Sequence, residues 1–138
     1  MTDPAIGAHA PQLLHAMVAV ADLERSLGFY VALLGMREIR RIAVPERALT
    51  MVFLGYADAP AGAMQLELWH EAGAPAAAPA AHASHVGIGV RDLPGCVAAL
   101  AARGVRVLRA PGPMRPGGRA IAIVADPDGH EVELLASD

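Results

Sequence analysis

The stretch His15-Ala-Met-Val-Ala-Val-Ala-Asp22-Leu23 recurs seventy residues later as His85-Val-Gly-Ile-Gly-Val-Arg-Asp92-Leu93. Four of the nine aligned pairs are identical, including the histidine and the Asp-Leu that ends each copy. An apolar segment with helical spacing follows each copy and ends at a glycine, Gly35 in the first and Gly104 in the second. Such a repeat predicts that the chain is built from two related halves.

Each half has the pattern of a strand, a helix and three further strands. In the first half we expect strands at 13–20, 37–44, 49–55 and 64–70 and a helix over about 23–34, capped by Asp22. In the second half we expect strands at 85–90, 105–109, 119–125 and 130–135 and a helix over about 93–103. Residues 110–119 are rich in proline and glycine and are therefore expected to form a loop.

The expected fold class is α+β, with two paired βαβββ modules forming a cupped mixed sheet. We predict a single domain over residues 1–138, made of a module at 12–71 and a module at 83–136. An Ala/Pro/Gly-rich linker at 72–82 joins them. Each module is near the ~60-residue size at which independent folding becomes marginal, so we expect the two modules to need each other.

Composition excludes several classes of function. The chain has 138 residues, of which 54% are hydrophobic and 18% charged, so a disordered chain is excluded. Its net charge is −3 and all eleven of its positive side chains are arginine, without a basic stripe, so nucleic acids and membranes are poor partners. The N-terminus lacks the pattern of a signal peptide, and a cytoplasmic location is expected. The single cysteine, Cys96, is expected to be a packed helix residue.

Strand alternation places one histidine and one glutamate of each half on the sheet face opposite the helices. These are His15 and Glu67 in the first half and His85 and Glu133 in the second. One such residue alone is more often structural or solvated, but four at equivalent positions indicate a common site. Two imidazoles and two carboxylates suit a divalent first-row metal ion with open positions for water or substrate.

The same residues carry a family resemblance. The chain resembles the vicinal-oxygen-chelate superfamily, and within it the short bacterial glyoxalase I (lactoylglutathione lyase) family, from about residue 12 to 136. The matching stretches are Leu13 to Val18, Asp22 to Ser26, Phe29-Tyr30, Leu34 to Met36, Phe53 to Tyr56, Leu66 to Leu68, His85 to Ile88, Asp126 to Gly129 and Val132 to Leu134.

The resemblance implies a metal ion held by His15, Glu67, His85 and Glu133. It implies nickel or cobalt as the favoured ion, with zinc, manganese or iron also compatible with this ligand set. It further implies a homodimer with sites at the subunit interface, where His15 and Glu67 of one chain meet His85 and Glu133 of the other. The implied reaction converts the hemithioacetal of methylglyoxal and a thiol, through an enediolate, to an S-lactoyl product. Glu133 and Glu67 are the implied catalytic bases.

Two positions depart from the pattern of this family. Ala19 stands where the family has an arginine that helps to hold the glutathione carboxylate, and Glu71 stands where it has an asparagine. We expect the residues that contact substrate to be Trp69, Met114, Arg115 and Arg119. The remaining histidines in a tail, a linker and a turn, His9, His82 and His130, are expected to be solvent-exposed.

Three alternative functions stay open at the level of sequence. The first is an isomerase that resembles methylmalonyl-CoA epimerase, which shares the module and the enolate chemistry. The second is an extradiol-type dioxygenase, although a fourth ligand such as Glu67 would occupy a position needed for substrate or oxygen. The third is a non-catalytic protein that binds a small molecule or antibiotic. Binding proteins of this kind in the superfamily typically lack the metal ligands.

Overall fold

The computed structural model describes residues 5–73, 79–80 and 82–137. Residues 74–78 and 81, which make up much of the linker predicted at 72–82, lie outside the described residues. We call residues 12–71 the first half and residues 83–136 the second half.

The first half has the predicted order of elements. Asp22 caps the helix, because its side chain accepts a hydrogen bond of 3.1 Å from the backbone N–H of Arg25. The helix then widens into π-helical turns, in which the N–H of Leu34 bonds to the carbonyl of Phe29 at 2.9 Å, and Gly35 ends it at φ +77°. The elements are β1 (His15–Ala19), α1 (Leu23–Leu27), η2 (Gly28–Leu33), β2 (Arg37–Val44), β3 (Leu49–Gly55) and β4 (Gln65–Glu71), with short 3-10 turns η1 (Gly7–His9) and η3 (Pro45–Arg47).

The second half repeats this order. Its helix begins after Asp92, whose side chain accepts a hydrogen bond of 3.2 Å from the N–H of Gly95. The chain turns out of the helix at Gly104, which has φ +87°. The elements are β5 (His85–Val90), α2 (Leu93–Ala102), β6 (Val107–Pro113), β7 (Ala120–Ala125) and β8 (Glu131–Ala136).

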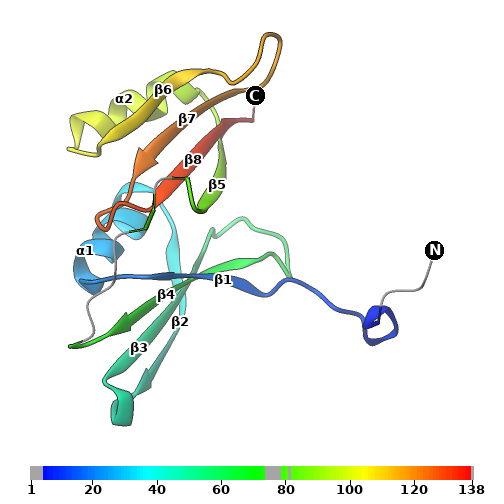
Figure 1. The fold of residues 1–138 in the computed structure, drawn as a ribbon, viewed down its shortest axis with the longest axis vertical. Coiled ribbons are helices and arrows are strands. Elements are labelled where there is room, and N and C mark those ends of the chain that lie inside the picture. The colour runs from blue at the N-terminus through cyan, green and yellow to red at the C-terminus, as the bar shows by residue number, and fades with distance from the viewer. Residues whose placement is uncertain (1–4, 74–78, 81, 138) are drawn as a thin grey trace.

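The two halves form two four-stranded mixed sheets with matching strand orders, β1-β4-β3-β2 and β5-β8-β7-β6. The first strand of each half runs parallel to the last, and the other neighbours are antiparallel. Figure 1 shows the sheet of the second half above that of the first, with α1 at the left of the view. The α+β fold class and the internal repeat predicted from the sequence are therefore confirmed.

One core joins the two halves. Buried residues of the first sheet, of η2, of α2 and of the second sheet form a single hydrophobic cluster, and partly buried residues of α1 pack against it. Tyr30 and Leu134 are both almost fully buried in this cluster, although they come from different halves. The apolar faces predicted from strand alternation supply the core, as the burial of Leu66, Leu68 and Val132 shows.

The prediction of a loop over residues 110–119 is wrong for its first residues, 110–113. β6 continues to Pro113, with shifts of register between Val107 and Arg109 and between Arg109 and Gly112. The prolines are tolerated because β6 lies at the edge of its sheet, where a missing N–H costs no ladder bond. Among the described residues, none of the helices is long and apolar enough to cross a membrane.

Candidate metal centre

The first pair of predicted ligands, His15 and Glu67, lies on two neighbouring parallel strands. Nε2 of His15 is 3.0 Å from Oε2 of Glu67. The side chain of His15 is 43% exposed, whereas that of Glu67 is only 6% exposed. The ring of Phe53 meets the His15 ring edge-on, with the centroids 5.3 Å apart. A buried carboxylate therefore lies beside a partly exposed and oriented imidazole.

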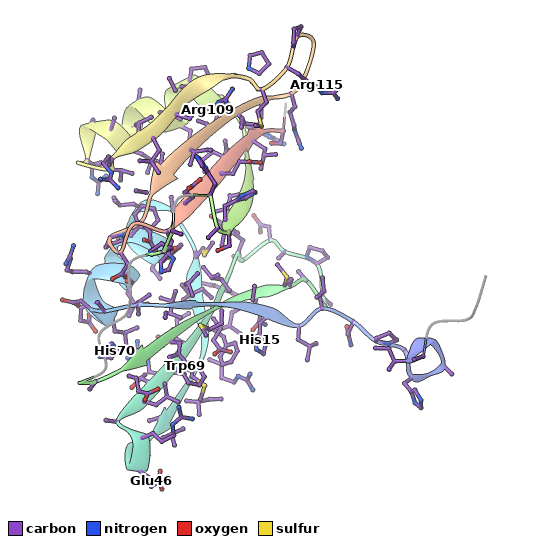
Figure 2. The ribbon with its side chains drawn as sticks, viewed as in Figure 1. His15, Glu46, Trp69, His70, Arg109 and Arg115 are labelled. Atoms are coloured by element: carbon purple, nitrogen blue, oxygen red, sulfur yellow. The ribbon has the colours of Figure 1, made fainter. Side chains whose placement is uncertain are left out.

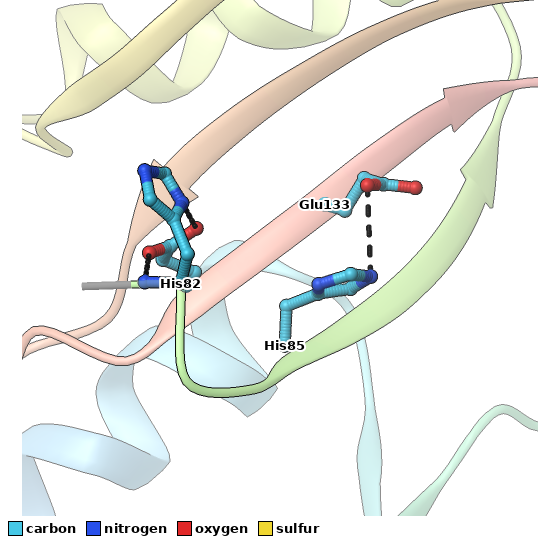
Figure 3. A network of polar contacts seen from close by, with 4 residues as sticks. His82, His85 and Glu133 are labelled. Atoms are coloured by element: carbon cyan, nitrogen blue, oxygen red, sulfur yellow. Dashed lines mark hydrogen bonds and ion pairs between the residues drawn. The ribbon is translucent and has the colours of Figure 1, made fainter. Parts of the chain in front are cut away.

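The second pair, His85 and Glu133, repeats this arrangement (Figure 3). Nε2 of His85 is 3.6 Å from Oε2 of Glu133, and the glutamate is again the more buried partner. In each half the histidine lies on the edge strand, and the glutamate is aligned with the residue two positions beyond it: Met17 is aligned with Glu67, and Gly87 with Glu133. The two pairs are thus equivalent by register as well as by sequence.

The distances in both pairs fit ligands of one first-row metal ion. Two ligand atoms bound at ~2.1 Å lie roughly 3.0 Å apart at right angles and roughly 3.4 Å apart in a tetrahedron. The observed separations of 3.0 Å and 3.6 Å lie close to these values. Each pair could therefore offer two adjacent ligands to such an ion, one nitrogen and one oxygen.

Within one chain the two pairs do not join. Among the described residues, the group of three or more ligand side chains with atoms within 4.8 Å of one another is Asp126, Asp128 and His130, outside the predicted set. That group could hold a metal ion, but its ligand atoms already make hydrogen bonds within the fold. The carboxylate of Asp126 accepts hydrogen bonds from the N–H groups of Asp128 and His130 and from the hydroxyl of Tyr30, at 2.9, 2.8 and 2.7 Å.

The turn at 126–130 fastens the second half to the end of β1. Asp128 accepts a hydrogen bond of 3.2 Å from the backbone N–H of Ala21. Nε2 of His130 lies 2.8 Å from the carbonyl of Ala19. The expectation that His130 is solvent-exposed is therefore wrong, because its ring spans the junction between the halves. This group acts as a structural clamp, and we call residues 126–130 the clamp turn.

The sheet face that carries His15 and Glu67 also holds two arginines that sequence reasoning missed. The guanidinium of Arg40 lies 4.4 Å from the centroid of the Phe53 ring, and that of Arg47 lies 5.4 Å from the Trp69 ring. Arg40 is aligned with Phe53 across β2 and β3, and Phe53 with Glu67 across β3 and β4, so register carries this face across the sheet. The alternation of side chains along β2 places Arg40 on this face, and this pattern could have identified Arg40 from the sequence.

Glu71, the departure noted in the sequence, is neutralised locally. Its Oε1 is 3.1 Å from Nη2 of Arg47 and accepts a hydrogen bond of 3.2 Å from the indole N–H of Trp69. The carboxylate of Glu71 is therefore part of a small polar cluster with Arg47 and Trp69. Ala19, the other departure, offers no charged group at the end of β1.

The predicted substrate residues lie on two different sheets. Trp69 lies on the lower sheet in Figure 2, whereas Arg115 lies at the tip of the hairpin between β6 and β7 at the top of the view. Met114 is 68% exposed beside it. Arg119 donates a hydrogen bond of 2.6 Å from Nε to the carbonyl of Ala136. One chain therefore does not bring these residues to a common surface.

His82 and Glu131 form a neighbouring network that the sequence did not predict (Figure 3). The backbone N–H of His82 donates a 2.7 Å hydrogen bond to Glu131, and Nδ1 of His82 lies 3.2 Å from the same carboxylate. These bonds, led by the backbone bond, hold the pKa of Glu131 below its ordinary value. Although the His82 ring is exposed as predicted, its backbone fixes the start of the segment that leads into His85.

Cys96 behaves as expected. It lies on α2, is partly buried against the core, and burial raises the pKa of its thiol. A raised pKa disfavours the thiolate that a nucleophile or redox centre needs.

Comparison with known proteins gives a consistent result. The family model described as the Glyoxalase/Bleomycin resistance protein/Dioxygenase superfamily matches residues 12–134. A protein of Haemophilus influenzae named lactoylglutathione lyase is 40% identical over 124 residues, which cover 90% of this chain and 91% of that protein.

Solved structures agree with the sequence relatives. The trypanothione-dependent glyoxalase I of Leishmania major is 36% identical, with a TM-score of 0.78 over 92% of this chain and 87% of that chain. Glyoxalase I from Zea mays is 30% identical, with a TM-score of 0.80 over 90% of this chain. The match covers 44% of the maize chain, so this chain spans less than half of that protein. These names do not favour the epimerase, dioxygenase or antibiotic-binding alternatives.

Proposed function

Since this chain belongs to the Glyoxalase/Bleomycin resistance protein/Dioxygenase superfamily, we propose that it is a metal-dependent lyase of the glyoxalase I type. Its reaction isomerises the hemithioacetal of methylglyoxal and a thiol to the S-lactoyl product. The observation that carries this proposal is the repeated His–Glu pair, His15 with Glu67 and His85 with Glu133, at matching register in both sheets.

The four residues of the two pairs are the proposed metal ligands. When bound, the ion supplies Lewis-acid polarisation of the two substrate oxygens. Glu133 removes the proton from one substrate carbon and returns it to the adjacent carbon, as a general base and then a general acid. Glu67 holds the equivalent place on the other face of the substrate. Nickel or cobalt is the ion we propose, since imidazole and carboxylate ligands suit both.

The proposed active unit is a homodimer. One pair offers only two ligands, and the two pairs of a chain stay separate, so a four-ligand site needs His15 and Glu67 of one chain and His85 and Glu133 of another. β1 and β5, which carry the histidines, are edge strands. Leu13, Leu14 and Met17 expose 77%, 63% and 51% of their surface on or beside β1, which favours a covering partner.

The proposal extends to the substrate and to the organisation of the chain. Trp69, Met114, Arg115 and Arg119 are the proposed substrate contacts, drawn together only when two chains meet. The two modules, 12–71 and 83–136, act as one domain through their common core. The proposed location is the cytoplasm, where thiol co-substrates are kept reduced.

Metal analysis together with an activity assay tests this function. We expect the nickel- or cobalt-loaded protein to form S-lactoylglutathione from the glutathione hemithioacetal, and Glu133→Gln to lower kcat by at least a hundredfold. The double variant His85→Ala/Glu133→Ala should lose metal uptake. Arg91→Ala, an exposed arginine between β5 and α2, is the matched surface control and should keep both properties.

Two results would overturn the proposal. Absence of metal uptake by the wild-type protein, or equal uptake by the double variant, would remove the site assignment. Metal uptake without formation of the lactoyl product would keep the site and transfer the function to another enolisable substrate.

A further inference from the structure

A concave site lies at the junction between the halves, and none of the four residues of the His–Glu pairs lines it. It is a groove of about 600 Å³ between α1 with η2 in the first half and two segments of the second half. These segments are residues 103–106, which lead from α2 into β6, and residues 125–129, which include most of the clamp turn. We call it the junction groove.

Three arginines line the junction groove: Arg25 from the first half, and Arg103 and Arg106 from the second. All three are exposed, and among the described residues none of them has a carboxylate within ion-pair distance. By contrast, Arg41 and Arg47 are held by Glu38 and Glu71. Three arginines that have no carboxylate partner among the described residues therefore line one concave surface.

The two acidic residues of the groove, Asp126 and Asp128, offset only part of this charge and leave one net positive charge on its lining. The oxygens of Asp126 accept hydrogen bonds from two backbone N–H groups and from Tyr30. Those of Asp128 face the N–H of Ala21 and the hydroxyl of Ser26, at 3.2 and 3.5 Å. Both carboxylates are thus committed to donors of the fold, and the three arginines outnumber them.

We propose that the junction groove binds a small multivalent oxyanion, carrying a diphosphate or several carboxylates, through Arg25, Arg103 and Arg106. Guanidinium groups present planar pairs of N–H donors that match phosphate and carboxylate oxygens. Several arginines around one concavity suit an anion with more than one charged group better than a single surface ion. The groove also has an apolar side, where Phe29 and Leu33 lie, for the uncharged part of such a molecule.

A ligand in this groove would touch both halves at once. The clamp turn forms one wall of the groove and also bonds to Ala19 and Ala21 at the end of β1. Binding there therefore stabilises the junction that fixes the strand carrying His15. Because a ligand that binds only the folded state raises its stability, the melting temperature should rise with ligand concentration.

Calorimetric titration of the full chain with inorganic pyrophosphate, and separately with citrate, tests this site. We expect binding by the wild type, and at least tenfold weaker binding by Arg103→Ala/Arg106→Ala and by Arg25→Ala. Arg91→Ala removes an equal charge elsewhere on the second half and should bind like the wild type. A preference for pyrophosphate would identify phosphate-bearing ligands, and a preference for citrate would identify polycarboxylates.

Two controls separate this site from the metal centre. Metal content is measured before and after titration, so that chelation is not counted as binding. Glu133→Gln and Arg47→Ala, both on the metal-centre side, should keep pyrophosphate affinity. The proposal is overturned if the wild type binds neither anion, if Arg91→Ala weakens binding as much as the groove variants, or if Arg47→Ala abolishes it instead.

Discussion

At the scale of single residues, Tyr30 shows how one polar group ties the two halves together inside the core. Its side chain is fully buried, and its hydroxyl donates a 2.7 Å hydrogen bond to Asp126 of the clamp turn. Burial, together with the charge of Asp126, raises the pKa of Tyr30 well above its ordinary value near 10.0. Burial and the neighbouring carboxylate therefore favour the protonated phenol in the folded protein.

Tyr30→Phe should lower the free energy of unfolding by about 1–3 kcal/mol at pH 7, because it leaves a buried carboxylate oxygen unpaired. It should also change the pH dependence. Above about pH 10 the unfolded wild-type chain releases the Tyr30 proton while the folded chain keeps it, so wild-type stability falls as pH rises. This component is absent from the variant, whose stability should fall less steeply. Urea unfolding between pH 7 and 11 measures both effects.

Tyr56→Phe is the matched control for the measurement at pH 7. The hydroxyl of Tyr56 donates to the neutral carbonyl of Leu34 at 2.8 Å and is partly exposed. Its removal should cost less than about 1 kcal/mol, because water can replace the bond. Equal losses in the two variants would contradict the role assigned to the Tyr30–Asp126 bond.

At the scale of elements, local sequence patterns were sufficient to predict strands whose side chains alternate between two faces and helices that a capping residue precedes. Alternation predicted that His15 and Glu67 share a face, and the register of β1 with β4 agrees. It did not predict that Glu67 would be buried, because this burial depends on a neighbouring strand and on Phe53.

Long-range contacts explain what the sequence could not predict. The clamp turn joins residues more than ninety positions apart, as in the bond between Tyr30 and Asp126. The separation of the two His–Glu pairs likewise depends on how one half packs on the other. Neither the contacts of the clamp turn nor the separation of the pairs follows from the periodicity of a local stretch of sequence. The end of β6 was missed because proline and glycine indicate a loop unless the strand is known to lie at an edge.

Gly104 offers a prediction about the end of α2. Its φ of +87° is a conformation that side chains with a Cβ rarely adopt, and there is open space around the position. Gly104→Ala should therefore cost about 1–2 kcal/mol from backbone strain alone. Thermal or urea unfolding at fixed protein concentration, without added metal, measures this loss.

Gly28→Ala is the matched control for this prediction. Gly28 has φ −57°, within the helical region, and again nothing lies near the added Cβ. The change should leave stability unchanged or raise it by up to about 1 kcal/mol. A loss as large as that of Gly104→Ala would show that the methyl group, and not the sign of φ, causes the effect.

At the scale of the whole molecule, the fold keeps apart the two His–Glu pairs that the proposed chemistry needs in one site. Each half carries one complete His–Glu pair on an edge strand and the neighbouring strand. The shared core and the clamp turn fix the halves in an arrangement that keeps these pairs apart. In the proposed function, duplication of the half supplies two half-sites per chain, and two chains would be required to build complete sites.

Complementation between two inactive variants tests this directly. In a cross-chain site, homodimers of His15→Ala and of His85→Ala each carry a defect in both sites. A mixed dimer places both substitutions in one site and leaves the other site intact, so purified mixed dimers should show about half of the wild-type activity and metal content. Co-expression with two different affinity tags, followed by metal analysis and the lyase assay, provides the measurement. If each site were built within one chain, every site of the mixed dimer would lack one histidine, and neither metal nor activity would return.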